Sequence, residues 1–246
     1  MIFDFSPLQL TLITLIFVWS GFVRSGFGFG GAALALPLLL LVHDQTIYWM
    51  PIIAVHLMLF TSLTLRTRWR QVNWAYLRKS LLFIVPSSLV GVFGLINLPN
   101  KMLLVIIYGI TLTYAVMWLV NWTIRSRRNW VDNILLIIGG YFSGTSLTGA
   151  PLLFAVFLRN VAIPQLRNTM FVVWFLICAL KMSAFVAFKV EINLVTSLIL
   201  VPFTAIGHIV GLKLHDHIMQ NDQLFKRIIG GVLIFICVFG LWRVFG

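Results

Sequence analysis

Two short stretches that interrupt the apolar sequence carry groups suited to binding an anion. The first motif is Ser25-Gly-Phe-Gly-Phe-Gly-Gly-Ala32, and the second motif is Ser143-Gly-Thr-Ser-Leu-Thr-Gly-Ala150, 118 positions further on. Glycines let a ligand approach the backbone, amide groups at a helix start attract negative charge, and hydroxyl side chains add short donors. The candidate ligand contacts are Ser25, Gly26, Gly28, Gly30, Gly31, Ser143, Gly144, Thr145, Ser146, Thr148 and Gly149.

Two cationic side chains are predicted to lie inside apolar segments. Arg24 directly precedes the first motif, and Lys181 lies within the apolar run 168–188. Placing a cationic side chain near the centre of a bilayer costs about 2.5–3.5 kcal/mol on insertion scales, so a cation found there usually has a functional role. All six carboxylates fall in predicted loops, ends or interfaces. Our hypothesis is that an anionic substrate supplies the opposite charge, and the alternatives are that Lys181 extends toward an interface or that Arg24 binds backbone carbonyls.

Two histidines within predicted membrane segments, His56 and His208, leave two interpretations open. Each could contact substrate or relay protons, or could be a hydrogen-bonded core residue. Cys178 and Cys237 show no spacing typical of a metal or redox site, and we expect them to be core residues. The sequence therefore predicts neither a metal nor a cofactor.

The composition predicts an all-α integral membrane protein. Of the 246 residues, 61% are hydrophobic and 10% are charged, and the mean hydropathy is +1.02. The net charge of +12 comes from basic residues between apolar runs, which favours a lipid bilayer surface over nucleic acid as the partner. Apolar runs near the roughly 20 residues that cross a bilayer lie at 47–65, 80–98, 102–122, 168–188, 193–212 and 228–245.

Two further apolar regions, 8–42 and 133–159, contain the motifs and differ from ordinary spans. The first is too long for one membrane helix, and the second is too short for two. We predict that each folds as a helical hairpin broken at its motif, leaving open whether it is re-entrant or crosses fully. The chain then consists of a first repeat (1–122) and a second repeat (123–246), each with one hairpin and three spans, in one membrane domain.

Proline and glycine residues outside the motifs also recur in the second half of the chain, at a nearly constant sequence separation. The matched residues are Pro86 and Pro202, Gly91 and Gly207, and Gly109 and Gly231. Internal symmetry with glycine-broken apolar segments at matching places is a sequence signature of transporters and of their binding sites. The alternative is that the glycines only let helices pack closely.

The basic residues predict that the two repeats are inverted. With a hairpin at each motif, the segments 66–79, 123–130, 159–167 and 213–227 share one face and hold thirteen Lys and Arg residues. The opposite face holds three, which are Lys101, Lys189 and Arg243. The positive-inside rule makes the basic face cytoplasmic and places both termini outside. The hairpin apices would then meet near the midplane, in a cavity that satisfies their broken backbone.

Enzyme motifs are absent from the sequence. The stretch from Gly26 to Gly31 follows an apolar, helix-like run and lacks the lysine of a phosphate-binding loop. No GxSxG, HExxH or suitably paired carboxylates occur. We therefore predict that the protein is not an enzyme.

The pattern of Gly26 to Gly31 followed by Pro37, repeated more weakly from Gly144 to Pro151, resembles the sulfite exporter TauE/SafE family, also called the toluene-sulfonate uptake permease family. The resemblance covers almost the whole chain. It implies a bacterial inner-membrane permease for anions such as sulfite, sulfonates or sulfoacetate. The second motif departs from the more glycine-rich form, with Thr145, Ser146, Leu147 and Thr148 between its glycines.

These observations together predict a secondary transporter that binds a small anion between the two hairpin apices and works by alternating access. In this interpretation Arg24 and Lys181 supply charge, and the motifs supply hydrogen bonds. The alternatives are an anion channel that uses the same site and a membrane-embedded accessory or enzyme subunit. The residues leave open the direction of transport, the coupling ion and whether the chain forms a homo-oligomer.

Overall fold

All regular structure in the described part of the chain is helical, as predicted. The computed structural model describes residues 4–27, 31–122, 124, 128–220 and 222–246. Within these ranges lie ten α-helices and a 3₁₀ turn at Trp69–Gln71. The helices are α1 (Pro7–Phe27), α2 (Gly31–Val42), α3 (Thr46–Arg68), α4 (Trp74–Asn97), α5 (Asn100–Leu119), α6 (Asn129–Ser146), α7 (Ala150–Asn160), α8 (Ile163–Ala187), α9 (Leu194–Gln220) and α10 (Asp222–Phe245).

Seven helices in the described ranges are long and apolar enough to cross a membrane. Six of them, α3, α4, α5, α8, α9 and α10, match the six predicted spans. The seventh is α1, the long first arm of the region that contains the first motif. Its second arm, α2, has 12 residues, and α7 in the corresponding place has 11.

The described helices stop and start at both motifs, and at the second motif the turn between them is described. The helix α1 ends at Phe27 and α2 begins at Gly31, while α6 ends at Ser146 and α7 begins at Ala150. Leu147 ends α6 with a left-handed backbone at φ 59°, and its N–H donates to the Ser143 carbonyl at 3.1 Å. This closing turn stops the helix, because the left-handed conformation does not continue the regular ladder.

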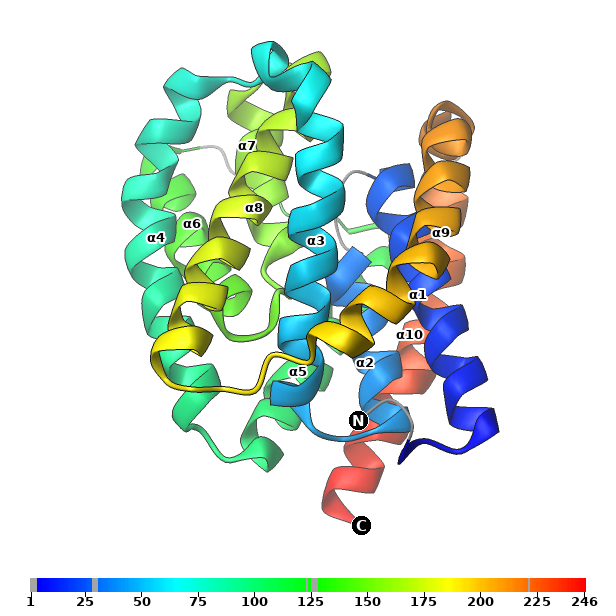
Figure 1. Cartoon of the computed structure of the whole chain (residues 1–246). Helices are drawn as coiled ribbons and strands as arrows, with labels where there is room; N and C mark the ends of the chain where they lie inside the picture. Colours follow the sequence, from blue (N-terminus) through cyan, green and yellow to red (C-terminus); the bar gives the residue numbers. More distant parts are fainter. Residues whose placement is uncertain (1–3, 28–30, 123, 125–127, 221) are drawn as a thin grey trace. The chain divides into compact units, whose positions relative to one another are not determined.

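The first of two compact units comprises Met1–Ile52, Leu98–Thr123 and Asn193–Gly246. In it α1 lies along α9, and α10 packs against α5 (Figure 1). Glycine permits a very close approach of α1 and α9, because a Cβ atom on Gly207 would lie 1.8 Å from the Val18 carbonyl oxygen. The two helices are therefore in backbone contact.

The second unit comprises Ile53–Asn97 and Ile124–Ile192. In it α4 lies along α6, and α7 and α8 pack beside them (Figure 1). A Cβ atom on Gly91 would lie 2.2 Å from the Tyr141 carbonyl oxygen, and one on Gly144 would lie 2.2 Å from the Ser88 carbonyl oxygen. The Ser88 hydroxyl donates to the Gly140 carbonyl at 3.0 Å. Each unit contains helices from both predicted repeats.

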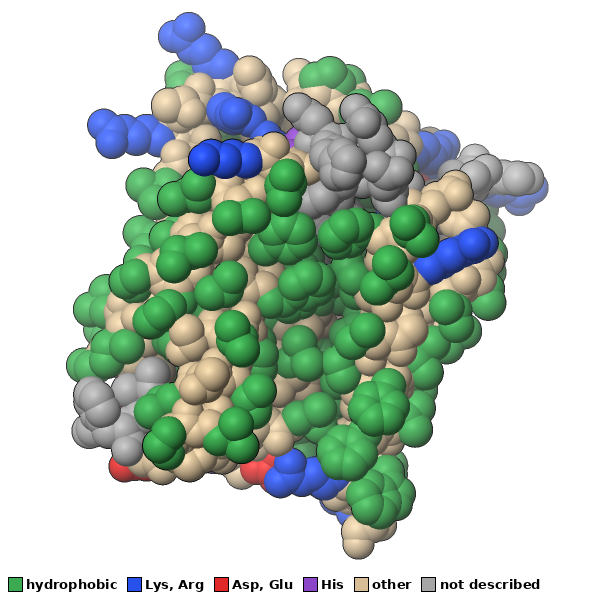
Figure 2. Space-filling model, turned by 90° about the vertical axis from the view of Figure 1, so that its right-hand side faces the viewer, with side chains coloured by type: hydrophobic (Ala, Val, Ile, Leu, Met, Phe, Trp, Pro, Cys, Tyr) green, Lys and Arg blue, Asp and Glu red, His purple; other side chains and the backbone are tan. Residues whose placement is uncertain are grey.

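The surface of the described helices is strongly apolar. Figure 2 shows a face that is mostly hydrophobic, with Lys and Arg side chains near its ends. Large exposed side chains occur along α10, among them Val232, Phe235 and Trp242. Such a surface suits hydrocarbon rather than water as its solvent.

Three of the basic segments predicted as loops lie largely within helices. Arg66 and Arg68 belong to the last turn of α3, and Arg159 to the last turn of α7. Lys213 lies in α9. Helices extend beyond their apolar runs because continued helix satisfies the backbone, while long basic side chains can reach polar surroundings. The predicted segment 123–130 includes Arg125 and Arg127, which lie outside the described residues.

We predict that Gly207→Ala lowers the thermal stability of the purified protein, whereas Gly231→Ala does not. The added methyl group at Gly207 meets the α1 backbone, which cannot yield as a side chain can. Overpacking of this kind costs about 1–3 kcal/mol. Nothing lies within 4 Å of a Cβ atom at Gly231, where alanine favours helix by up to about 1 kcal/mol. Thermal unfolding in detergent checks this, and equal melting temperatures for the two variants would contradict it.

Candidate functional site

The break between α6 and α7 is held by a buried cation. The Lys181 side chain, on α8, is fully buried, and its Nζ donates to the Ser143 carbonyl at 3.3 Å. The same carbonyl accepts the Leu147 N–H that closes α6. Lys181 therefore does not extend to a surface, and the alternative of an interfacial amine is wrong. Its amino group stands at the last turn of α6.

The hydroxyl groups of the second motif are all buried, but they are not equally available to a ligand. Thr145 Oγ1 donates to the Tyr141 carbonyl at 2.9 Å, and Ser146 Oγ donates to the Phe142 carbonyl at 3.2 Å. Ser146 has only one proton, so its 2.7 Å contact with Thr148 requires Thr148 to be the donor. Among the described atoms, Ser143 Oγ has no hydrogen-bond partner. Ser143 is thus the motif hydroxyl with an uncommitted proton.

A tryptophan that the sequence analysis did not single out lies on the same helix face as Lys181. Trp174 precedes Lys181 by seven residues on α8, and Cys178 lies between them at helical spacing. The indole N–H of Trp174 is buried without a hydrogen-bond partner among the described atoms. A buried indole usually finds an acceptor. The spacing of Trp174, Cys178 and Lys181 was the sequence signal for this face.

The residues around the first motif lie at the end of α1. Arg24, Ser25 and Gly26 are buried in its last turn, and α2 begins at Gly31. The Gly31 carbonyl accepts a hydrogen bond from Ser20 Oγ at 3.3 Å. The predicted ligand contacts Gly28 and Gly30 lie outside the described residues.

Two histidines of α9 hold the end of α1. His208 Nδ1 is hydrogen-bonded to Ser25 Oγ, and His215 Nδ1 contacts the Gly26 carbonyl at 2.6 Å. The second contact requires a proton on His215 Nδ1, because a carbonyl only accepts. His208 is thus a hydrogen-bonded histidine, one of the two interpretations left open. His215 was missed, although its seven-residue spacing from His208 places both on one face.

His56 belongs to the other unit. It is buried on α3, in the second unit, and its ring lies edge-on to Phe60 of the same helix with centroids 6.5 Å apart. The structure therefore places His56 and His208 in different units. Their predicted role in coupling or substrate contact stays a prediction.

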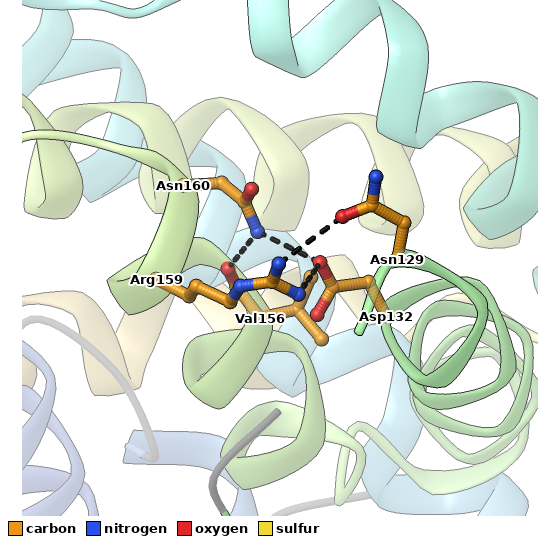
Figure 3. A network of polar contacts seen from close by, with 5 residues as sticks. All are labelled: Asn129, Asp132, Val156, Arg159 and Asn160. Carbon is orange, nitrogen blue, oxygen red and sulfur yellow. Dashed lines mark hydrogen bonds and ion pairs between the residues drawn. The ribbon is translucent and has the colours of Figure 1, made fainter. Parts of the chain in front are cut away.

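A polar network joins the far ends of the helix pair α6 and α7 (Figure 3). Asp132, in the first turn of α6, accepts from Arg159 Nη1 at 2.7 Å and from Asn160 Nδ2 at 3.1 Å. Arg159 also donates to Asn129 Oδ1 at 3.1 Å. The carboxylates were expected in loops, ends or interfaces, and Asp132 lies in the first turn of α6, where it is buried and paired. Because the ends are tied, the length of α7 fixes where the break lies against α6.

The chemistry of the second motif is that of hydrogen-bond donation to an anion. Lys181 and Ser143 offer N–H and O–H groups, and the first turn of α7 adds amides that its own helix cannot use. In the described ranges, no group of three or more His, Cys, Asp or Glu residues could hold a metal ion.

The helices and their apolar surface define an all-helical, multi-pass integral membrane protein. The sequence profile of the sulfite exporter TauE/SafE family matches residues 13–240, and the chain belongs to this family. The resemblance inferred from the glycine motifs is thereby confirmed. The protein is a membrane transporter and not an enzyme. Searches among curated proteins and among solved structures gave no match.

We predict that Asp132 and Arg159 are energetically coupled. In a double-mutant cycle built from Asp132→Ala and Arg159→Ala, groups in one network typically show a coupling of about 0.5–3 kcal/mol. Arg159 is the more exposed partner, with 31% of its side chain accessible, so we expect the lower part of this range. The measurement is thermal or denaturant unfolding of the four proteins. Asp132→Ala combined with Lys189→Ala is the control, which should be additive because Lys189 is exposed just beyond the far end of α8, and additivity in the Arg159 cycle would contradict the prediction.

Proposed function

We propose that the protein is a secondary transporter of a small sulfur-containing anion, such as sulfite or an organosulfonate. The observation that carries the proposal is the buried amino group of Lys181 at the break between α6 and α7. A cation at this position, surrounded by apolar helices, stabilises a negative charge far more than it would in water. The name of the family supports sulfite as the first substrate to test.

The groups around Lys181 suit a tetrahedral or pyramidal oxyanion. Ser143 Oγ and Trp174 Nε1 are donors with no protein acceptor among the described atoms, and both are buried. An oxyanion accepts several hydrogen bonds at once, so one ligand can satisfy donors that no single side chain satisfies. The start of α7 contributes the positive end of a helix dipole.

The first motif offers a second set of cationic and polar groups. Arg24 and Ser25 occupy the last turn of α1, beside the start of α2. In our proposal this break also lines the path of the anion. The sequence-based expectation that the two apices form one site near the midplane stays a prediction.

Corresponding contacts in the two units support an internal repeat. Gly91 and Gly207, which are 116 positions apart, each bring a proline-containing helix against the long arm of a broken pair. Gly91 lies on α4 against α6, and Gly207 lies on α9 against α1. Each long arm thus packs on a span of the other predicted repeat. Rocking of such interlocked repeats is the mechanism that we propose for alternating access.

The lengths of the short arms support re-entrant hairpins. At 1.5 Å per residue, α2 and α7 rise only about 18 Å, against roughly 30 Å of hydrocarbon. A helix that begins at one surface and is this short ends inside the membrane. Inverted repeats, a bacterial inner membrane, cytoplasmic basic segments and external termini complete the proposal, with the charge distribution as their support.

Flux measurements in proteoliposomes test the proposal. We predict saturable uptake of radiolabelled sulfite that is lowered about 10- to 150-fold at low substrate by Lys181→Gln, because a hydrogen bond to a charged group contributes about 1.5–3 kcal/mol. Arg24→Ala should lower it similarly. Sulfoacetate, taurine, thiosulfate and carboxylates serve as competitors, and counterflow separates a carrier from a channel.

Lys189→Gln is the matched control, because Lys189 is an exposed lysine just beyond the end of α8 and should not affect flux. Folded, inserted protein that moves no anion would overturn the proposal. Large single-channel currents without counterflow would show that the protein is an anion channel rather than a carrier.

A further inference from the structure

A polar pocket of ≈ 240 Å³ lies in the first unit, and no residue of either motif lines it. It opens where α5 begins and α10 ends, beside the segment that follows α2. Two cations, Lys101 and Arg243, and one carboxylate, Asp44, line it together with Asn100 and Tyr108. The pocket therefore presents both signs of charge within one small volume.

Its walls are held by hydrogen bonds that leave charged groups available. Asn100 Nδ2 donates to the Asp44 carbonyl at 2.6 Å, and Asn100 Oδ1 accepts the Thr46 N–H at 3.1 Å. Arg243 Nη1 donates to the Leu41 carbonyl at 2.8 Å, which uses one of its five N–H donors. The Asn100 contacts use the Asp44 backbone rather than its carboxylate.

Aromatic side chains place the pocket at the depth of lipid headgroups. Trp242 and Phe245, in the last turn of α10, are each 68% exposed. The Lys101 ammonium stands over the Phe245 ring, 5.4 Å from its centroid. Exposed tryptophan at the end of an apolar helix is typical of the membrane–water interface, where basic pockets between helices bind lipid headgroups.

We propose that this pocket binds the headgroup of an aminophospholipid, with a phosphate and a primary ammonium. Lys101 and Arg243 take the phosphate, and the Asp44 carboxylate accepts hydrogen bonds from the ammonium. A headgroup that carries only negative charge meets repulsion from Asp44. A choline headgroup offers no N–H donor to this carboxylate. The two cations and one carboxylate thus select phosphoethanolamine over glycerol and choline headgroups.

Native mass spectrometry of the detergent-purified protein tests this assignment. The probes are phosphatidylethanolamine, phosphatidylglycerol and phosphatidylcholine with identical acyl chains, each also supplied with inorganic phosphate as competitor. We expect phosphatidylethanolamine to be retained about tenfold better than phosphatidylcholine. Asp44→Asn should abolish this preference and raise binding of phosphatidylglycerol, while Lys101→Gln should weaken all phosphate-bearing lipids.

Lys189→Gln is the control, because it removes an exposed cation outside the pocket. The Asp44 and Lys101 variants decide the outcome, because a substitution of Arg243 would also remove its hydrogen bond to the Leu41 carbonyl. Equal retention of the three lipids, or a preference unchanged in Asp44→Asn, overturns the proposal. Displacement of the bound lipid by free phosphate at low concentration also overturns it, since the site would then recognise the inorganic anion.

Discussion

A helix that is interrupted among apolar neighbours exposes backbone groups that must be satisfied by protein, water or ligand, and the described contacts follow from this constraint. At the second motif the Ser143 carbonyl takes both the Leu147 N–H and the Lys181 ammonium. At the first motif His215 Nδ1 is hydrogen-bonded to the Gly26 carbonyl. In both places a polar side chain from a neighbouring long helix completes the broken end. Such a side chain brings a charge or a titratable proton into an apolar region. The side chain that stabilises the helix end therefore also has the chemistry of a binding site.

The broken helices need firm support, because the positions of their ends decide which donors a ligand meets. Backbone contact through Gly207 and Gly144 fixes α1 on α9 and α6 on α4. The ion pair of Asp132 and Arg159 fixes the other end of α7. The break between α6 and α7 is therefore held from both ends, and its hydrogen-bond donors are held in fixed positions. A rigid broken pair is also the kind of element that can move as a body during alternating access.

The sequence allowed the helical class, the six ordinary spans and the position of the break between α6 and α7 to be predicted, because hydropathy and glycine act locally. It also indicated the family. Side-chain partnerships were harder. Thr145, Ser146 and Thr148 were expected as ligand donors, but the structure commits their protons to the chain itself. Trp174 and His215 were not predicted as site residues. The hydrogen-bond partners of an indole or imidazole in an apolar run depend on the helix packed against it, which the sequence does not show. The extension of several helices beyond their apolar runs was also not predicted. In the sequence alone, charged residues at the end of an apolar run resemble those of a loop.

We propose that the break beside Lys181 binds the transported anion. Selenite is a close analogue of sulfite and contains an anomalous scatterer, so crystals grown with it locate the anion directly. We expect an anomalous peak within hydrogen-bonding reach of Lys181 Nζ and Ser143 Oγ, which Lys181→Gln removes. A peak elsewhere in the chain, with none at this break, would contradict the claim.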